Sequence, residues 1–334
     1  MKKPRLKMFA AWGLGLLLLF LLFIVGDGFD LIRLPEPRWG SVFLVFLFTV
    51  GFTIAHNFRW REIIESLSPT WRGEFFSLYR SLTDSYAIGK IIPMDLSLLG
   101  VRSYYLNRVE KLSFPVAVFS VLFDRFMDVV IFLLMALPSF LLIAGIASSI
   151  QSVSILVLLL LGQSLLICWK KGETFHYLFS ISRVLVFRWV SKIPILGNRV
   201  KRGIEQAGDP APFTLHAVIK IMAWNYVKYF FLSLRFYFTG RALGIPLPLL
   251  ETFFFLPFVQ LSGLINVTPG GIGVVEAGTY GALLLMGISK SQILIFVVGQ
   301  RVLLIGSFGA LFVLNRFFYF VRSKWRGEEG FSWK

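Results

Sequence analysis

The chain contains very little cysteine or histidine. Its 334 residues include one cysteine, Cys168, and three histidines, His56, His176 and His216. A single cysteine excludes an intrachain disulfide, and the scattered histidines lack the spacing of a metal site. We therefore expect neither a metal nor any other cofactor.

Acidic residues are also scarce, because 18 aspartates and glutamates stand against 34 lysines and arginines and give a formal net charge of +16. In a soluble chain this excess would suggest nucleic acid as a partner. Here most basic residues lie between apolar segments, which places them beside anionic lipid at a cytoplasmic membrane surface. We therefore expect membrane lipid, and no nucleic acid, as the partner.

Long apolar segments are abundant, and 56% of the residues are hydrophobic and 16% aromatic. Several runs approach the roughly 20 residues that a membrane helix needs. The composition predicts an all-α polytopic membrane protein that forms one transmembrane domain over residues 1–334. The apolar runs predict about six full spans, the first over residues 8–25.

The distribution of basic residues predicts the orientation of the spans. Four basic residues precede the first span, and another basic group follows residue 314. By the positive-inside rule both termini are cytoplasmic, as is the basic segment at about 170–212. Residues 41–57 form the second span in this interpretation. Its cytoplasmic flank would hold four arginines, Arg59, Arg61, Arg72 and Arg80.

Residues 82–106 are apolar in part, yet they contain Pro93 and have basic residues on both sides. A segment with both ends in the cytoplasm cannot cross the membrane once. A re-entrant hairpin broken at Pro93 meets this condition, and an amphipathic helix on the membrane surface is the alternative.

A second break, Pro269-Gly270-Gly271, separates the apolar runs 249–267 and 272–286. Backbone that is not helical is tolerated at membrane depth only where protein buries it or where it lines a cavity. This predicts a second re-entrant hairpin with a binding site at its break. The alternative is an ordinary turn outside the membrane between two full spans.

The two breaks belong to an internal repeat. Three pairs of residues share one separation of 176 positions: Pro93 and Pro269, Ser113 and Ser289, and Arg125 and Arg301. Each unit would hold a broken hairpin followed by a long helix with an arginine, over about residues 82–146 and 249–317. The first hairpin would enter from the cytoplasm and the second from outside. This predicts an inverted-topology repeat, as in many secondary transporters.

Two groups of residues resemble the half-signatures of one family. Residues 268–278 (TPGGIGVVEAG), Ser289 and Arg301 resemble the second half-signature of the lysylphosphatidylglycerol synthase transmembrane-domain, or flippase-like, family. Pro93, Arg102 and residues 124–128 resemble the first. The family pattern has Gly-Glu shortly after the first proline, and Ser97-Leu98 stand there in this chain.

The resemblance implies a multipass protein of a prokaryotic inner membrane that moves lipids between leaflets. It also implies a neighbouring enzyme of lipid or glycan synthesis, such as a glycosyltransferase, as a partner.

The residues themselves predict a binding site for a phosphate-bearing lipid headgroup between the two hairpins. Backbone amides after the second break and the helix dipole would attract the anion. Arginine side chains would add charge-assisted contacts, and the first hairpin, which lacks the glycines, would rely more on side chains such as Arg102. The predicted binding residues are Pro93, Arg102, Arg125, Pro269, Gly270, Gly271, Gly273, Glu276 and Arg301.

Other charged residues leave alternatives open. Glu276 would pair with an arginine or carry a proton, and Asp124 and Asp128 would couple transport to protons or hold helices together as an ion cluster. Three cations at 213–238 must extend to the interfaces, face a partner or face water. They are Lys220, Lys228 and Arg235.

Three functions fit these features. A lipid flippase or scramblase fits the repeat and the intramembrane arginines best, so we expect a transporter and no enzyme. A membrane enzyme acting on a lipid-linked substrate would need paired carboxylates, which only Asp84 with Asp95 or Asp124 with Asp128 approach. A membrane partner of a glycosyltransferase without its own activity would need no charge at mid-membrane depth.

Overall fold

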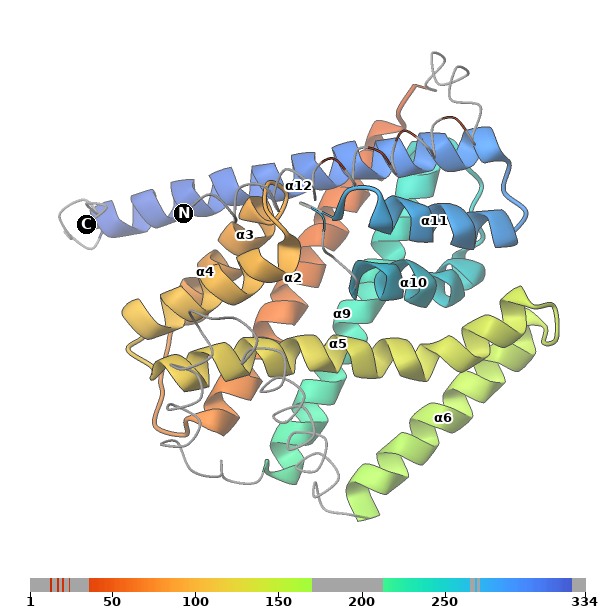
Figure 1. The fold of residues 1–334 in the computed structure, drawn as a ribbon. Helices are drawn as coiled ribbons and strands as arrows, with labels where there is room; N and C mark the ends of the chain where they lie inside the picture. Colours follow the sequence, from red (N-terminus) through yellow and green to blue (C-terminus); the bar gives the residue numbers. More distant parts are fainter. Residues whose placement is uncertain are drawn as a thin grey trace.

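The computed structural model describes residues 36–169, 213–264, 268 and 271–325, and the isolated positions 13, 17, 20 and 24. The helices of Figure 1 are α2 (Trp39–Leu67), α3 (Phe75–Ile88), α4 (Met94–Arg108), α5 (Phe114–Ile143), α6 (Ser149–Trp169), α9 (Leu215–Ala242), α10 (Leu249–Leu264), α11 (Val274–Leu285) and α12 (Lys290–Trp325). No strand occurs among the described residues. The basic segment 170–212 lies outside the described residues. The predicted first span does too, apart from the four isolated positions.

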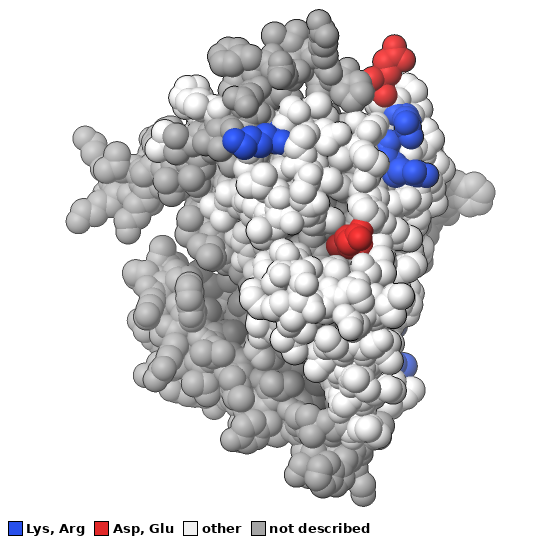
Figure 2. Space-filling model, turned by 90° about the vertical axis from the view of Figure 1, so that its right-hand side faces the viewer, with Lys and Arg blue, Asp and Glu red and all other residues white. Residues whose placement is uncertain are grey.

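The structure confirms a helical membrane protein. Three of the described helices, α2, α5 and α12, are long and apolar enough to cross a membrane. Large apolar side chains on α5 and α12, such as Leu133, Val302 and Phe318, are more than 60% exposed, as lipid contact requires. Figure 2 shows a broad face with almost no charged side chains. The number of six spans stays a prediction.

Both predicted helix breaks are present. A turn between α3 and α4 ends at Pro93, which is the residue before the first turn of α4. Between α10 and α11, Gly271 and Gly273 have φ angles of 72° and 86°, in the left-handed region that glycine adopts without a steric penalty. The glycines therefore allow the chain to change direction between two apolar helices.

Helix α2 is longer than the sequence suggested. The predicted span ended at Asn57, but the helix continues to Leu67, and Arg59 is fully buried within it. Arg59 therefore belongs to the interior of the protein, and its cytoplasmic side stays a prediction. A hydropathy pattern ends a span at the first charges, whereas the ion pairs described below hold this arginine inside the protein.

The helices form two similar units, unit one (α2–α5) and unit two (α9–α12). The first residues of α2 and α9 are 176 positions apart, as are those of α5 and α12, and the other two pairs are 174 and 180 apart. Helices α2 and α9 thus share this spacing, although they lie outside the repeat segments predicted from the sequence.

The two hairpins pack on the long helices in the same way. The second helix of each hairpin packs on the long helix of its own unit, α4 on α5 and α11 on α12. The first helix packs on the long helix of the other unit, α3 on α12 and α10 on α5. Each hairpin thus lies between the two long helices, which run in opposite directions in Figure 1. At the centre α2 lies against α9, and the Arg38 amide donates to the Ala242 carbonyl at 3.0 Å.

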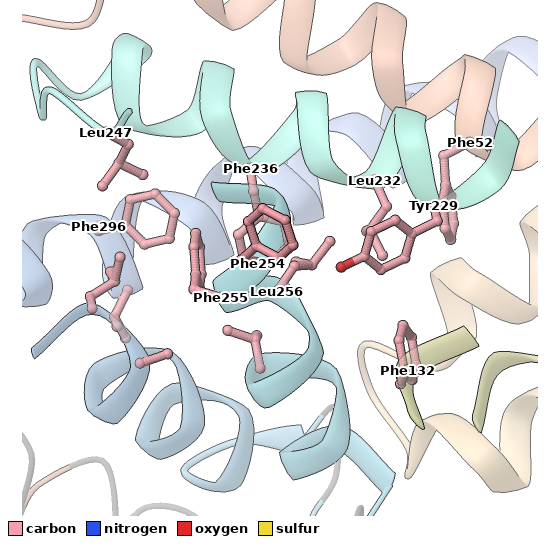
Figure 3. Close-up of a cluster of buried hydrophobic side chains, with 14 of the residues drawn as sticks. Phe52, Phe132, Tyr229, Leu232, Phe236, Leu247, Phe254, Phe255, Leu256 and Phe296 are labelled. Carbon is pink, nitrogen blue, oxygen red and sulfur yellow. The ribbon is translucent and has the colours of Figure 1, made fainter. Parts of the chain in front are cut away.

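The core lies where unit two meets α2 and α5. Phe236 of α9, Phe254 and Phe255 of α10 and Phe296 of α12 gather there (Figure 3). The buried Tyr229 hydroxyl donates to the Phe253 carbonyl at 2.7 Å, which satisfies its polar group inside this apolar region. The core fixes α9 and α12 beside the hairpin of unit two.

Candidate functional site

A cavity of about 930 Å³ lies between the two hairpins and the long helices. Residues of α2, α3, α4, α5, α9, α10, α11 and α12 line it, so both units build one site. Four predicted binding residues line this cavity: Pro93, Arg125, Glu276 and Arg301. Pro269 and Gly270 lie outside the described residues.

The lining combines charge with large apolar surfaces. Five of its residues are basic: Lys90, Arg125, Lys228, Arg235 and Arg301. Three are acidic: Asp95, Asp128 and Glu276. These eight charges sum to a formal +2, and most of the other lining residues are aliphatic or aromatic. The cavity therefore suits a molecule with an anionic group and an apolar part.

The two arginines of the repeat make equivalent ion pairs. Nη2 of Arg125 on α5 is 3.1 Å from Oδ1 of Asp95, in the first turn of α4. Nε of Arg301 on α12 donates to Oε1 of Glu276 at 2.7 Å, in the first turn of α11. Each long helix is thus tied to the second helix of its own hairpin.

Glu276 also caps the helix that it begins. The Gly273 amide donates to Oε2 of Glu276 at 2.7 Å, and the Gly271 amide donates to the Thr268 carbonyl at 3.0 Å. The carboxylate supplies the negative charge that the N-terminus of a helix favours. Of the three glycines predicted to bind the anion, the two that the structure describes donate their amides within the chain, and neither lines the cavity.

Beside the cavity lies a buried ion cluster. It consists of His56, Arg59, Arg102, Asp124, Asp128, Asn225 and Lys228. Arg59 is its centre, with Nε donating to Oδ1 of Asp124 at 2.8 Å and Nη1 donating to Oδ1 of Asp128 at 2.7 Å. Nε2 of His56 lies 2.6 Å from Oδ2 of Asp124, and Lys228 donates to Asp128 at 2.5 Å. The cluster joins α2, α4, α5 and α9.

Two predicted functional residues belong to this cluster and do not line the cavity. Arg102 and Asp124 are fully buried, and Nη1 of Arg102 donates to Oδ2 of Asp124 at 2.9 Å. The Arg102 guanidinium also lies 3.7 Å from the centre of the Trp60 ring, a cation–π contact. Arg102 and Asp124 therefore hold helices together. Asp128 belongs to both the cavity and the ion cluster, because it lines the cavity and pairs with Arg59 and Lys228.

Three basic residues of the site were not among the binding residues predicted from the sequence. Lys90 lines the cavity from the turn of the first hairpin, and Lys228 and Arg235 line it from α9. The sequence held a signal for Arg235, because it follows Arg59 by the same 176 positions that separate Arg125 from Arg301.

Comparison with known families agrees with the fold. Residues 8–310 match the model of the lysylphosphatidylglycerol synthase TM region, which covers most of the chain. The comparison with curated proteins finds no significant match. The family indicates a membrane protein of lipid synthesis or lipid flipping. The chain therefore belongs to the lysylphosphatidylglycerol synthase TM region family.

Proposed function

We propose that the protein is a flippase or scramblase that moves a phosphate-bearing lipid between membrane leaflets. The observation that supports this most is the cavity between the hairpins, with its formal charge of +2 and its apolar walls. An anionic headgroup would bind near the basic residues, and the acyl or prenyl chains would remain against apolar side chains and lipid.

The arrangement of the two units suits alternating access. Mirrored contacts and opposite directions of α5 and α12 are the features of an inverted-topology repeat, in which the substrate binds where the broken helices meet. The two hairpins would then be re-entrant. Rocking of one unit against the other would open the cavity to each leaflet in turn.

The cavity has an exposed rim at the first turn of α4. The Asp95 side chain is 52% exposed and Leu96 is 58% exposed, and both line the cavity. A headgroup could enter beside these residues while its chains pass over the apolar outer surface. This route fits an amphiphile better than a small soluble anion.

Transport is favoured over chemistry because the candidate catalytic carboxylates already have cationic partners. Asp124 and Asp128 pair within the ion cluster, and Asp84 pairs with Arg316 at 3.1 Å. Such carboxylates are poorly placed to act on a substrate as general acid or base. We place the protein in the inner membrane of a prokaryote with both termini cytoplasmic, beside an enzyme that makes or uses its lipid.

The proposal is tested with purified protein in vesicles that contain fluorescently labelled phosphatidylglycerol. A quencher that cannot cross the membrane reports how fast the inner-leaflet lipid reaches the outside. Wild-type protein should raise this rate above that of vesicles without protein. Arg125→Ala and Arg301→Ala should abolish the increase, because they release the hairpins that form the cavity.

Arg61→Ala is the matched control, since Arg61 pairs with Glu65 at 2.8 Å and does not line the cavity. It should transport lipid as the wild type does. A wild-type rate equal to that of empty vesicles contradicts the proposed function, and unchanged rates in both cavity variants contradict the role of these arginines.

A further inference from the structure

Equivalent positions of the two units carry the same basic residue. Arg59 on α2 and Arg235 on α9 are 176 positions apart, and each precedes a buried aromatic residue, Trp60 or Phe236. Arg59 is 0% exposed and Arg235 is 6% exposed. Both arginines therefore lie inside the protein, where a cation requires a counter-charge or equivalent contacts.

Within the described part of the chain, only unit one supplies a counter-charge to this arginine. Arg59 pairs with Asp124 and Asp128 of α5. The positions of α12 that correspond to these aspartates hold Gln300 and Leu304, which line the cavity and carry no charge. The carboxylates that neutralise the arginine of unit one are thus missing from unit two.

The surroundings of Arg235 in the cavity consequently differ from those of Arg59. Among the described residues no carboxylate forms a salt bridge with it, and its buried Nη1 atom has no hydrogen-bond partner. The contacts of its guanidinium are with aromatic rings, at 5.0 Å from the centre of Phe52 and 5.9 Å from that of Phe236. These rings hold the cation in place and leave its N–H donors for a ligand.

Lys90, in the turn of the first hairpin, adds a second basic side chain to the cavity. Its ammonium lies 5.1 Å from the centre of the Phe308 ring, and it is close enough to Arg235, Arg301 and Glu276 to interact electrostatically. In the described part of the chain Lys90 forms no salt bridge. Arg235 and Lys90 thus form a pair of cations between α9 and the turn of the first hairpin.

We infer that Arg235 and Lys90 are the anion-binding residues of the proposed transporter, and that the phosphodiester of the lipid takes the place that the Asp124 carboxylate takes in unit one. This inference rests on the proposed function and assigns its substrate contacts. Arg125 and Arg301 have carboxylate partners of their own, so they position the hairpins around the headgroup.

The surroundings select the class of ligand. Leu232, Val297 and Phe308 line the same cavity beside the two cations, so an anion attached to an apolar chain fits better than free phosphate. A quaternary ammonium headgroup would place a positive charge near Lys90 and Arg125. The site therefore favours an anionic phospholipid such as phosphatidylglycerol over phosphatidylcholine.

A carboxylate supplied by the protein should compete with the lipid. Gln300→Glu places an acid at the position that corresponds to Asp124, where it would neutralise Arg235. Binding of short-chain phosphatidylglycerol to the full-length protein in detergent is measured by the rise in its thermal unfolding temperature. We expect the affinity to fall about 10- to 100-fold, as loss of a charge-assisted contact implies.

The matched control is Gln292→Glu, the same change on the same helix at a residue that does not line the cavity. It should keep wild-type affinity. Arg235→Leu and Lys90→Ala are the second pair of variants, and each should weaken binding as Gln300→Glu does. Elution of each variant as a single species of wild-type size, together with a cooperative unfolding transition, separates loss of binding from loss of fold.

Several outcomes overturn the inference. The first is that short-chain phosphatidylglycerol does not stabilise the wild type. The second is that Gln300→Glu and Arg235→Leu bind it with wild-type affinity, and the third is that phosphatidylcholine stabilises the protein equally. Equal stabilisation by inorganic phosphate would replace the lipid by a soluble anion and overturn the assigned class. If the binding pattern holds but vesicles show no lipid movement, the site stands and the proposed transport fails.

Discussion

Units one and two place equivalent arginines in different electrostatic settings. In unit one Arg59 is enclosed by Asp124 and Asp128, so carboxylates of the protein neutralise its charge. In unit two the corresponding Arg235 faces a cavity beside Gln300. The comparison teaches that two similar units can enclose one arginine in ion pairs and expose the corresponding arginine to a cavity, when the residues opposite it differ.

The largest difference should appear when the two arginines are replaced by leucine. Arg59→Leu leaves Asp124 paired with Arg102 and Asp128 paired with Lys228, but it removes the central hydrogen-bond donor of the cluster. Several buried acceptors lose their partner, so the free energy of unfolding should fall by about 3–5 kcal/mol. Arg235→Leu removes a buried cation without a described counter-charge and should leave stability unchanged or raise it. Unfolding in detergent without added lipid measures both, and equal losses would remove the distinction between the units.

A smaller effect should separate the hairpins. A Cβ atom on Gly278 of α11 would lie 2.1 Å from the Ser262 hydroxyl oxygen of α10, so Gly278→Ala should cost about 1–3 kcal/mol of stability. On α4 of unit one, a Cβ atom on Gly100 would have no neighbouring atom within 4 Å. Gly100→Ala should therefore stabilise its helix by about 0.5–1 kcal/mol. The same assay compares them, and destabilisation of both would contradict the difference in packing.

The smallest difference concerns the ion pairs of the long helices. Glu276 is 4% exposed, pairs with Arg301 and caps α11, so Glu276→Gln should lower stability by about 1–2 kcal/mol. The equivalent pair of Asp95 and Arg125 is half-exposed, and Asp95→Asn should change stability by less than about 1 kcal/mol. High salt should weaken the Asp95–Arg125 pair more than the Glu276–Arg301 pair. A larger loss of stability in Asp95→Asn than in Glu276→Gln would contradict this comparison.

Features that depend on local backbone chemistry were predicted from the sequence. Pro93 and the glycines after Pro269 indicate helix breaks because proline and glycine disfavour helix interiors, and both breaks occur where expected. The spacing of Arg125 and Arg301 indicated two equivalent long helices, and α5 and α12 begin 176 residues apart. Local rules and internal symmetry thus predict much of the helical framework.

The partners of the charged residues could not be predicted in the same way. Arg102 was expected to bind substrate, and for Arg235 an interface, a partner and water were left open as surroundings. In the structure Arg102 donates to Asp124 and Arg235 lines the cavity. Whether a buried cation is neutralised depends on which side chain faces it from another helix. That choice is made by tertiary packing, which the hydropathy and charge patterns of single segments do not report.

The ion cluster also affects how the chain is made. Arg59 is synthesised 65 residues before Asp124 and 166 residues before Asn225, yet its side chain bonds to both. Helix α2 is apolar enough to cross a membrane by itself, but Arg59 lies in its last third, and an arginine inside the bilayer without a partner costs about 2.5–3.5 kcal/mol on insertion scales. The carboxylates that neutralise Arg59 belong to α5 and its amide partner to α9, so the arginine has these partners only after both later helices have been synthesised.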